Sequence, residues 1–180
     1  MKGFTRREPL FSLCGLKCGL CRMHLGGYCP GCGGGEGNQS CAIARCSLEH
    51  GGPEFCWDCP EYPCARYEGF DECDSFVPHS ARARDAAEAR SLGIEAYMAR
   101  MRESAALLEE LLGGYNDGRR KTLFSTAADL LPPEDLRAVL ERLRAQAEGL
   151  ELKERAALAA RLLTEAAQAR GLSLKLVKKP

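Results

Sequence analysis

Ten of the eleven cysteines lie between residues 14 and 64, and their spacing suits metal coordination. They are Cys14, Cys18, Cys21, Cys29, Cys32, Cys41, Cys46, Cys56, Cys59 and Cys64. Three Cys-x2-Cys pairs occur among them, at Cys18/Cys21, Cys29/Cys32 and Cys56/Cys59. Two thiolates at this spacing can lie on one tight turn and point at one ion, while two further ligands come from elsewhere in the chain. All ten are therefore candidate metal ligands.

The sequence CPGCG at residues 29–33 is the sharpest of the three pairs. Pro30 restricts one backbone angle, and Gly33 can adopt a positive φ. The turn can then direct backbone amides at sulfur and spread the charge of the thiolates. One such pair is weak evidence for a metal site, but three within a short segment are strong evidence.

The assignment of cysteines to ions starts from these pairs. One four-cysteine site is predicted from Cys29, Cys32, Cys41 and Cys46. A second combines Cys18 and Cys21 with Cys56 and Cys59, which leaves Cys14 and Cys64 as alternates. Two ions are expected; ten cysteines with His24 and His50 would suffice for three. A single loop histidine more often faces solvent or forms a hydrogen bond, so His24, His50 and His79 enter no ligand set.

The ligand type favours zinc in a structural role, because closed sites of four thiolates are typical of structural zinc. The same ligands suit a [4Fe-4S] cluster, which is the alternative cofactor. Cys14, Cys18 and Cys21 also have the Cys-x3-Cys-x2-Cys spacing of radical enzymes that depend on S-adenosylmethionine. That chemistry is normally housed in a (β/α) barrel, and barrels run to about 200 residues or more. No alternation of strands and helices follows Cys21, so a radical enzyme is not expected.

Composition argues against two classes of partner. The chain has 25 basic and 25 acidic residues, and residues 1–80 carry a slight acidic excess, whereas nucleic-acid binding needs clustered positive charge. Residues 1–13 lack the apolar run of a signal peptide, and no stretch approaches the roughly 20 apolar residues of a membrane span. A cytoplasmic location is expected, where thiols stay reduced. The odd number of cysteines also argues against a closed disulfide framework.

The pattern divides the chain into a cysteine-rich module at residues 1–79 and a helical domain at residues 80–180. Between Cys14 and Cys73 no helical or strand period is sustained, and Gly and Pro recur, so this segment needs a staple to offset its chain entropy. From Ser80 the composition becomes rich in Ala, Leu, Arg and Glu with a helical period. Helices are predicted over residues 81–92, 94–112, 119–131, from Pro133, and over 152–170, with Gly113 and Gly114 ending the second. The predicted fold is a small irregular metal-stapled cysteine-rich module plus an all-α helical C-terminal domain.

Three further features receive ordinary interpretations. Residues 113–122 (GGYNDGRRKT) have glycines at the spacing of a phosphate-binding loop, but Arg119 and Arg120 replace its Lys and Ser/Thr, and a helix precedes it. Cys73 is either a free thiol or a buried small residue, and the second is favoured. Residues 173–180 are expected to form a frayed or edge-strand terminus.

Several motifs in order carry a resemblance to a known family: CGLKCGLC, then CPGC, then IARC, then CWDCPEYPCARYEGF. Together they resemble the cysteine-rich bacterial and archaeal family catalogued as domain of unknown function 3795, over about residues 13–70. The segment YNDGRRKTLFSTAADLLPPEDL is similar to a helical segment of longer members. The resemblance implies a multi-cysteine zinc-binding module and supports a metal role for the ten cysteines. It implies no reaction.

The predicted function is non-enzymatic binding, with an unidentified protein as partner and the oligomeric state left open. Trp57, Tyr62 and Tyr67 could anchor an interface, or could equally pack between the two halves. The alternative is a redox or metal-handling protein, such as an iron-sulfur carrier or thiol sensor, because ten cysteines exceed the eight that two closed sites need. A zinc hydrolase or transferase would need an open site and a base, for which only Asp58 and Glu61 are candidates.

Overall fold

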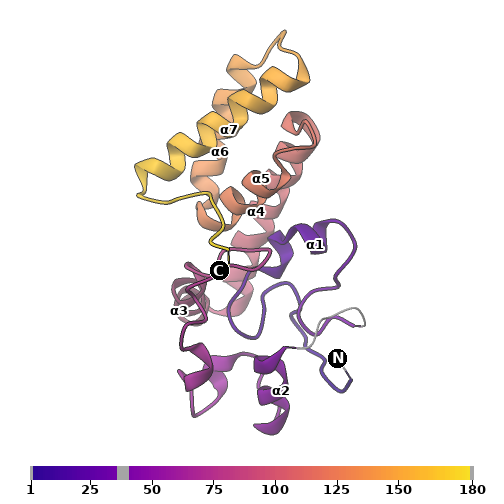
Figure 1. Cartoon of the computed structure of the whole chain (residues 1–180), viewed down its shortest axis with the longest axis vertical. Coiled ribbons are helices and arrows are strands. Elements are labelled where there is room, and N and C mark those ends of the chain that lie inside the picture. The colour runs from indigo at the N-terminus through magenta and orange to yellow at the C-terminus, as the bar shows by residue number, and fades with distance from the viewer. Residues whose placement is uncertain (1, 36–40, 179–180) are drawn as a thin grey trace. The chain divides into compact units, whose positions relative to one another are not determined.

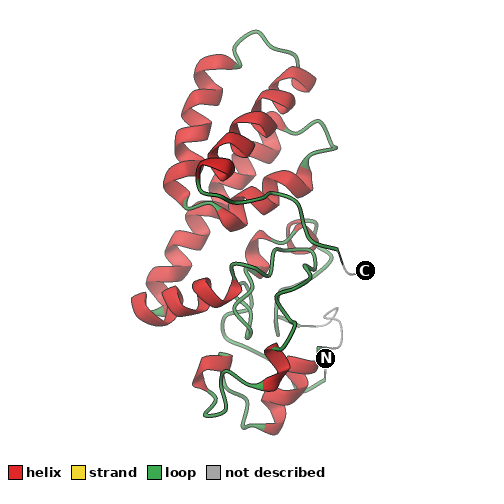
Figure 2. Cartoon of the chain, turned by 60° about the vertical axis from the view of Figure 1, so that its left-hand side comes forward, coloured by secondary structure: helices red, strands yellow, loops and turns green. Residues whose placement is uncertain are grey.

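A computed structural model describes residues 2–35 and 41–178, which form helices and loops with no strand among them (Figure 2). In chain order the helices are η1 (Cys18–Leu20), α1 (Arg22–Leu25), α2 (Ala42–Glu49), η2 (Cys56–Asp58), η3 (Ala65–Tyr67), α3 (Arg82–Leu92), α4 (Ile94–Tyr115), α5 (Lys121–Leu130), α6 (Pro133–Gln146) and α7 (Leu152–Ala169), where η marks 3-10 helices. The prediction of an all-α C-terminal domain after a cysteine-rich region is confirmed, whereas the region predicted to be irregular contains the short helices η1, α1, α2, η2 and η3. The barrel of a radical enzyme is not found in the described segments. No helix in these segments is long and apolar enough to cross a bilayer.

The chain forms two compact units: Met1–Met98 with Val177–Pro180, called the cysteine-rich unit, and Ala99–Leu176, called the helical unit. In the helical unit, α7 packs against both α5 and α6 (Figure 1). Its fully buried side chains include Leu108, Leu111, Phe124, Leu136, Leu140, Leu143, Leu162 and Leu163. The spacing of Leu136, Val139, Leu140 and Leu143 predicts a buried stripe on α6, and the structure confirms these residues as core.

The ends of the last two helices follow from local sequence. Pro133 occupies the first turn of α6, with Glu134 and Asp135 beside the positive end of the helix dipole. A capping box between Glu151 and Glu154 opens α7. Gly171 follows the end of α7 with a φ of 69°, a conformation that favours glycine. The predicted starts at Pro133 and Leu152 are both confirmed.

The predicted end of the helix over residues 94–112 is wrong, because α4 continues through Gly113 and Gly114 to Tyr115. A glycine inside a helix costs only about 1 kcal/mol relative to alanine. The Tyr115 ring is buried, and burial of a large side chain contributes about 1.5–3 kcal/mol. The gain from one more helical turn therefore offsets the weak propensity of the two glycines.

The cysteine-rich unit extends beyond the predicted boundary at residues 79/80, since α3 and the start of α4 belong to it. Lys17 Nζ lies 2.9 Å from Asp85 Oδ2 of α3, and the Asp85 side chain is buried. The Phe11 ring packs 4.8 Å from the Tyr97 ring of α4, measured between centroids. A Cβ atom on Gly15 would lie 3.0 Å from the Arg82 carbonyl oxygen, so only glycine permits this approach. These contacts place the division inside α4, at Met98/Ala99.

Aromatic rings and one buried arginine organise the rest of this unit. Arg82 donates two hydrogen bonds to the Asp71 carboxylate, at 2.6 and 2.7 Å, and its guanidinium lies 4.2 Å from the Tyr67 ring centroid. Trp57 stacks on Phe55 at 4.2 Å, and Tyr62 meets Tyr67 edge-on. The three aromatic residues considered as interface anchors are thus half-buried against neighbours within this unit.

The carboxyl-terminal tail is held to the cysteine-rich unit by a reciprocal pair of hydrogen bonds. The Asp74 amide donates to the Val177 carbonyl at 2.8 Å, and the Val177 amide donates to Asp74 Oδ2 at 2.7 Å. The tail does not form the edge strand considered from the sequence, although it is pinned at this one residue.

Candidate metal centre

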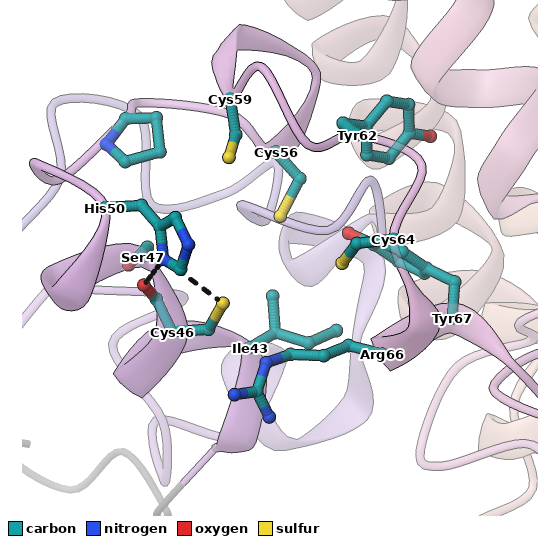
Figure 3. Close-up of a pocket in the computed structure, with 11 residues that line it drawn as sticks. Ile43, Cys46, Ser47, His50, Cys56, Cys59, Tyr62, Cys64, Arg66 and Tyr67 are labelled. Atoms are coloured by element: carbon teal, nitrogen blue, oxygen red, sulfur yellow. Dashed lines mark hydrogen bonds between the residues drawn. The ribbon is translucent and has the colours of Figure 1, made fainter.

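Four cysteine sulfurs point into one cavity of the cysteine-rich unit (Figure 3). The four residues, called the cavity cysteines, are Cys46, Cys56, Cys59 and Cys64. The cavity volume is about 30 Å³, and it is also lined by Ile43, Ser47, His50, Pro53, Tyr62, Arg66 and Tyr67. A site needs about 10–15 Å³ on this measure to hold one water, so the cavity admits one or two atoms of that size.

Short helices position the cavity cysteines. Cys46 projects from α2, while Cys56 begins the 3-10 turn η2 and Cys59 caps it. The Cys59 amide donates to the Cys56 carbonyl at 3.1 Å, which closes the Cys-x2-Cys turn and puts both sulfurs on the same side. Cys64 is the N-cap residue of η3. This is the arrangement expected of a Cys-x2-Cys pair that receives two further ligands from other segments.

The inner wall of the cavity contains a buried hydroxyl next to Cys56. Burial raises the pKa of the Cys56 thiol to about 11, and the Tyr67 side chain acts in the opposite direction by favouring the thiolate. The Tyr67 hydroxyl is buried and lacks a hydrogen-bond acceptor among the described residues. A thiolate at Cys56 would supply the acceptor that this hydroxyl lacks.

The outer edge of the cavity carries two basic side chains beside Cys46. The Arg66 guanidinium donates a hydrogen bond to the Cys46 sulfur, and this bond raises the pKa of the guanidinium. His50 Nδ1 donates to the Cys46 carbonyl at 2.8 Å and lies 3.6 Å from Cys46 Sγ. The Cys46 carbonyl and then Glu61, whose Oε1 lies 3.2 Å from Nε2, raise the pKa of His50. Positive charge at this edge would partly neutralise a cluster of thiolates.

The cavity cysteines fit a metal ion in type and number, but they are not at coordinating distance. No three His, Cys, Asp or Glu side chains of the described residues are arranged closely enough to hold an ion. No disulfide joins any of the cysteines either. Neutral thiols attract one another only weakly, whereas a metal ion replaces their protons and holds the thiolates close together. Small side-chain rotations toward the cavity centre would therefore accompany binding.

A second set of thiols lies nearer the amino terminus. Burial raises the pKa of the Cys14 thiol to about 12 and that of Cys18 well above its ordinary value. Burial likewise raises the pKa of Cys32. The charges of Cys32 and Cys14 also raise the pKa of Cys18. The charges of Cys21 and Cys29 also raise the pKa of Cys18. The charge of Cys41 raises the pKa of both Cys14 and Cys32.

The structure groups the predicted ligands differently from the sequence-based assignment. Cys46 shares a cavity with Cys56 and Cys59, whereas the assignment put Cys46 with Cys29, Cys32 and Cys41. Cys64, treated as an alternate, is one of the four cavity cysteines. Chain proximity had suggested the predicted grouping, but α2 carries Cys46 away to face the later Cys-x2-Cys turn. Cys73 lies in neither group and is half-buried.

Residues outside the predicted ligand sets complete the cavity. Arg66 and Tyr67 lie within a few residues of Cys64 and gave no spacing signal. His50 occurs one turn after Cys46 on the same helix, and that four-residue spacing could have indicated its proximity. The other two histidines bond elsewhere: His24 Nδ1 donates to the Cys29 carbonyl, and His79 is buried with Nδ1 donating to the Phe70 carbonyl.

No family model, curated protein or solved structure matches the chain. The resemblance to the family of domain of unknown function 3795 therefore stays a prediction.

Proposed function

We propose that the chain is a zinc-binding protein in which the cavity cysteines hold one structural zinc ion and staple the cysteine-rich unit. The observation that carries the proposal is the convergence of four thiol side chains from three segments on one small cavity. Four thiolates are the ligand set of closed structural zinc sites. Two ions are expected from the sequence, and a second ion would take its ligands from the other six cysteines.

The size of the cavity favours a single ion over the alternative iron-sulfur cluster. A volume of about 30 Å³ suits one ion. The number of thiols also bears on enzymatic zinc, which needs three protein ligands and a site for water. With four thiols facing the ion, no position remains for a reacting water.

The two carboxylates that could have served as catalytic bases have other roles. Asp58 Oδ2 accepts a hydrogen bond from the Phe55 amide at 3.1 Å and caps η2. Glu61 interacts with His50 at the outer edge of the cavity. A structural module with a binding role, to a protein partner of unknown identity, therefore fits these contacts better than a hydrolase or transferase.

Metal analysis of the protein tests the proposal. We expect protein purified without oxygen to contain zinc and to lack the visible absorption of an iron-sulfur cluster. Cys56→Ser should remove one ion per chain, whereas Cys73→Ser should leave the zinc content unchanged. Iron with visible colour would support the alternative, a redox or metal-handling protein. Metal-free protein that takes up no zinc would refute the proposal.

A further inference from the structure

One arginine of the cysteine-rich unit is buried with an unused donor. The Arg6 side chain is only 2% exposed. Its Nε donates to the Glu54 carbonyl and its Nη1 to the Phe11 carbonyl, both at 2.9 Å. Nη2 is buried and forms no hydrogen bond in the part of the chain that the structure describes. Such a donor, on a charged group, is costly unless an acceptor is provided.

The nearby carboxylate leaves one hydrogen-bond donor of Arg6 unused. Glu54 Oε1 lies 3.5 Å from Arg6 Nη2, so the two form an ion pair without a hydrogen bond at that nitrogen. The same carboxylate accepts hydrogen bonds from the Glu8 amide at 2.9 Å and the Arg7 amide at 3.3 Å. The face of the Phe55 ring covers the guanidinium at 4.9 Å. The remaining donor capacity of Arg6 is therefore available to another acceptor.

The turn that carries Cys32 is built directly against Arg6. The Arg6 amide donates to the Gly33 carbonyl at 3.2 Å, and the Cys32 amide donates to the Pro9 carbonyl at 2.7 Å. Gly33 has a φ of 75°, and a Cβ atom there would lie 2.9 Å from Arg6 Cγ. Glycine at position 33 thus serves both the backbone conformation and the close approach of Arg6. The Arg6 guanidinium is one of the groups that favour the Cys32 thiolate.

We propose that Cys32 is a ligand of a second metal ion, separate from the cavity site, and that Arg6 compensates the charge of its thiolates. The ion is a thiophilic divalent cation such as zinc. Cys14, which packs against the same cluster of buried side chains as Cys32, is a second ligand, and the other two come from the remaining cysteines of residues 18–41. Four thiolates and a divalent ion carry a net charge of about −2, which is unfavourable in a buried site without a neighbouring cation. The inference rests on the proposal that thiols of this unit bind metal.

Counting zinc ions per chain by native mass spectrometry tests the site. We expect two ions in the full-length protein and one in both Cys32→Ser and Cys56→Ser. The double variant should contain none. One ion in the unmodified protein that Cys32→Ser keeps and Cys56→Ser loses, or two ions in Cys32→Ser, would overturn the second site while leaving the cavity site intact. No ion in the unmodified protein would overturn both proposals, and loss of ions only in Cys32→Ser would overturn the cavity site alone.

The role of Arg6 is tested by the affinity of the Cys56→Ser protein for its remaining ion, measured by competition with a chelator. Loss of a group that supports a metal ligand typically weakens affinity by about 10–100-fold, and this is the change expected for Arg6→Gln. Arg6→Lys keeps the charge and should recover most of the affinity. Arg7→Gln is the matched control, because Arg7 is exposed and only 3.9 Å from the same Glu54 carboxylate.

The set of variants separates charge from folding. If Arg6→Gln and Arg6→Lys weaken the affinity equally, or if Arg6→Gln matches Arg7→Gln, Arg6 does not compensate the thiolate charge. Arg6→Gln could not be used if it unfolds the unit, which circular dichroism of the loaded protein would show. The role of Arg6 is then tested by comparing the metal affinities of Arg6→Lys and Arg7→Gln. An affinity in Arg6→Lys more than about 100-fold below that in Arg7→Gln would then overturn the role of Arg6.

Discussion

The two units of this chain bury different kinds of side chain. The helical unit fills its interior mainly with Leu, Ala, Val and Phe, although it also buries Asp129, and its ion pairs, such as Arg144–Glu110 and Arg142–Glu165, are half-exposed. The cysteine-rich unit buries both Arg82 and Asp85 and has four of its thiols around one small cavity. Helices with apolar stripes can be stabilised by burial alone. Before α3, the cysteine-rich unit has only the short helix α2 to bury an apolar face, so we propose that bound metal adds to the stability that its other contacts provide.

Metal removal should separate the two units most clearly. Structural zinc can supply about 10–16 kcal/mol of folding free energy in small domains, so a chelator should unfold the segment around residues 14–64. The helical unit, which has no predicted ligand, should retain its structure. Hydrogen exchange measured by mass spectrometry should show loss of protection at α2 and η2 but not at α6 and α7. Equal loss of protection in all four helices would mean that the units share one core.

A core substitution in the helical unit should have the second-largest effect. Leu140 of α6 is fully buried, and replacing such a leucine by alanine costs about 2–5 kcal/mol. We expect Leu140→Ala to lower the free energy of unfolding of the helical unit in urea while zinc content stays unchanged. Leu152→Ala, at a position that is 41% exposed, is the control and should change the stability by less than about 0.5 kcal/mol. Loss of zinc in Leu140→Ala would contradict the independence of the units.

Where the metal-free cysteine-rich unit remains folded, the pH dependence of its stability should distinguish the units as well. Burial raises the pKa of Cys14 to about 12 and that of Cys56 to about 11, from an ordinary value of 9.0. Above pH 9 the unfolded chain loses these protons while the folded unit keeps them, so the free energy of unfolding falls as pH rises. For Cys14 the fall is roughly 1 kcal/mol per pH unit. The fall in the free energy of unfolding should be complete near the pKa of the folded state. Below pH 9 these thiols should not make the free energy of unfolding depend on pH.

Urea unfolding at pH 8 and pH 10 measures this difference, with Cys14→Ala as the variant and Cys73→Ala as the control. The fall in stability between the two pH values should be smaller in Cys14→Ala than in Cys73→Ala. Equal falls in the two variants would show that Cys14 is not buried as a neutral thiol. The helical unit contains no cysteine, so α6 and α7 should show no such thiol-dependent fall.

Sequence reasoning worked best where one element determines its own structure. The stripe of α6 and the proline at its start are local signals, and the structure follows them. The grouping of cysteines was not predictable in the same way, because it depends on which way α2 turns Cys46. Contacts such as Lys17–Asp85 and Phe11–Tyr97 join residues far apart in sequence, and no spacing rule indicates them. They explain why the division lies within α4.

The smallest predicted effect concerns two glycines of the helical unit that differ only in backbone conformation. A Cβ atom at either Gly113 or Gly118 would meet nothing within 4 Å. Gly113 lies inside α4, where alanine is favoured by about 0.4–1 kcal/mol, so Gly113→Ala should stabilise the helical unit. Gly118 has a φ of 86°, which costs other residues about 1–2 kcal/mol, so Gly118→Ala should destabilise it. Urea unfolding followed at α4–α7 measures both changes, and the same sign in the two variants would mean that α4 frays before Gly113.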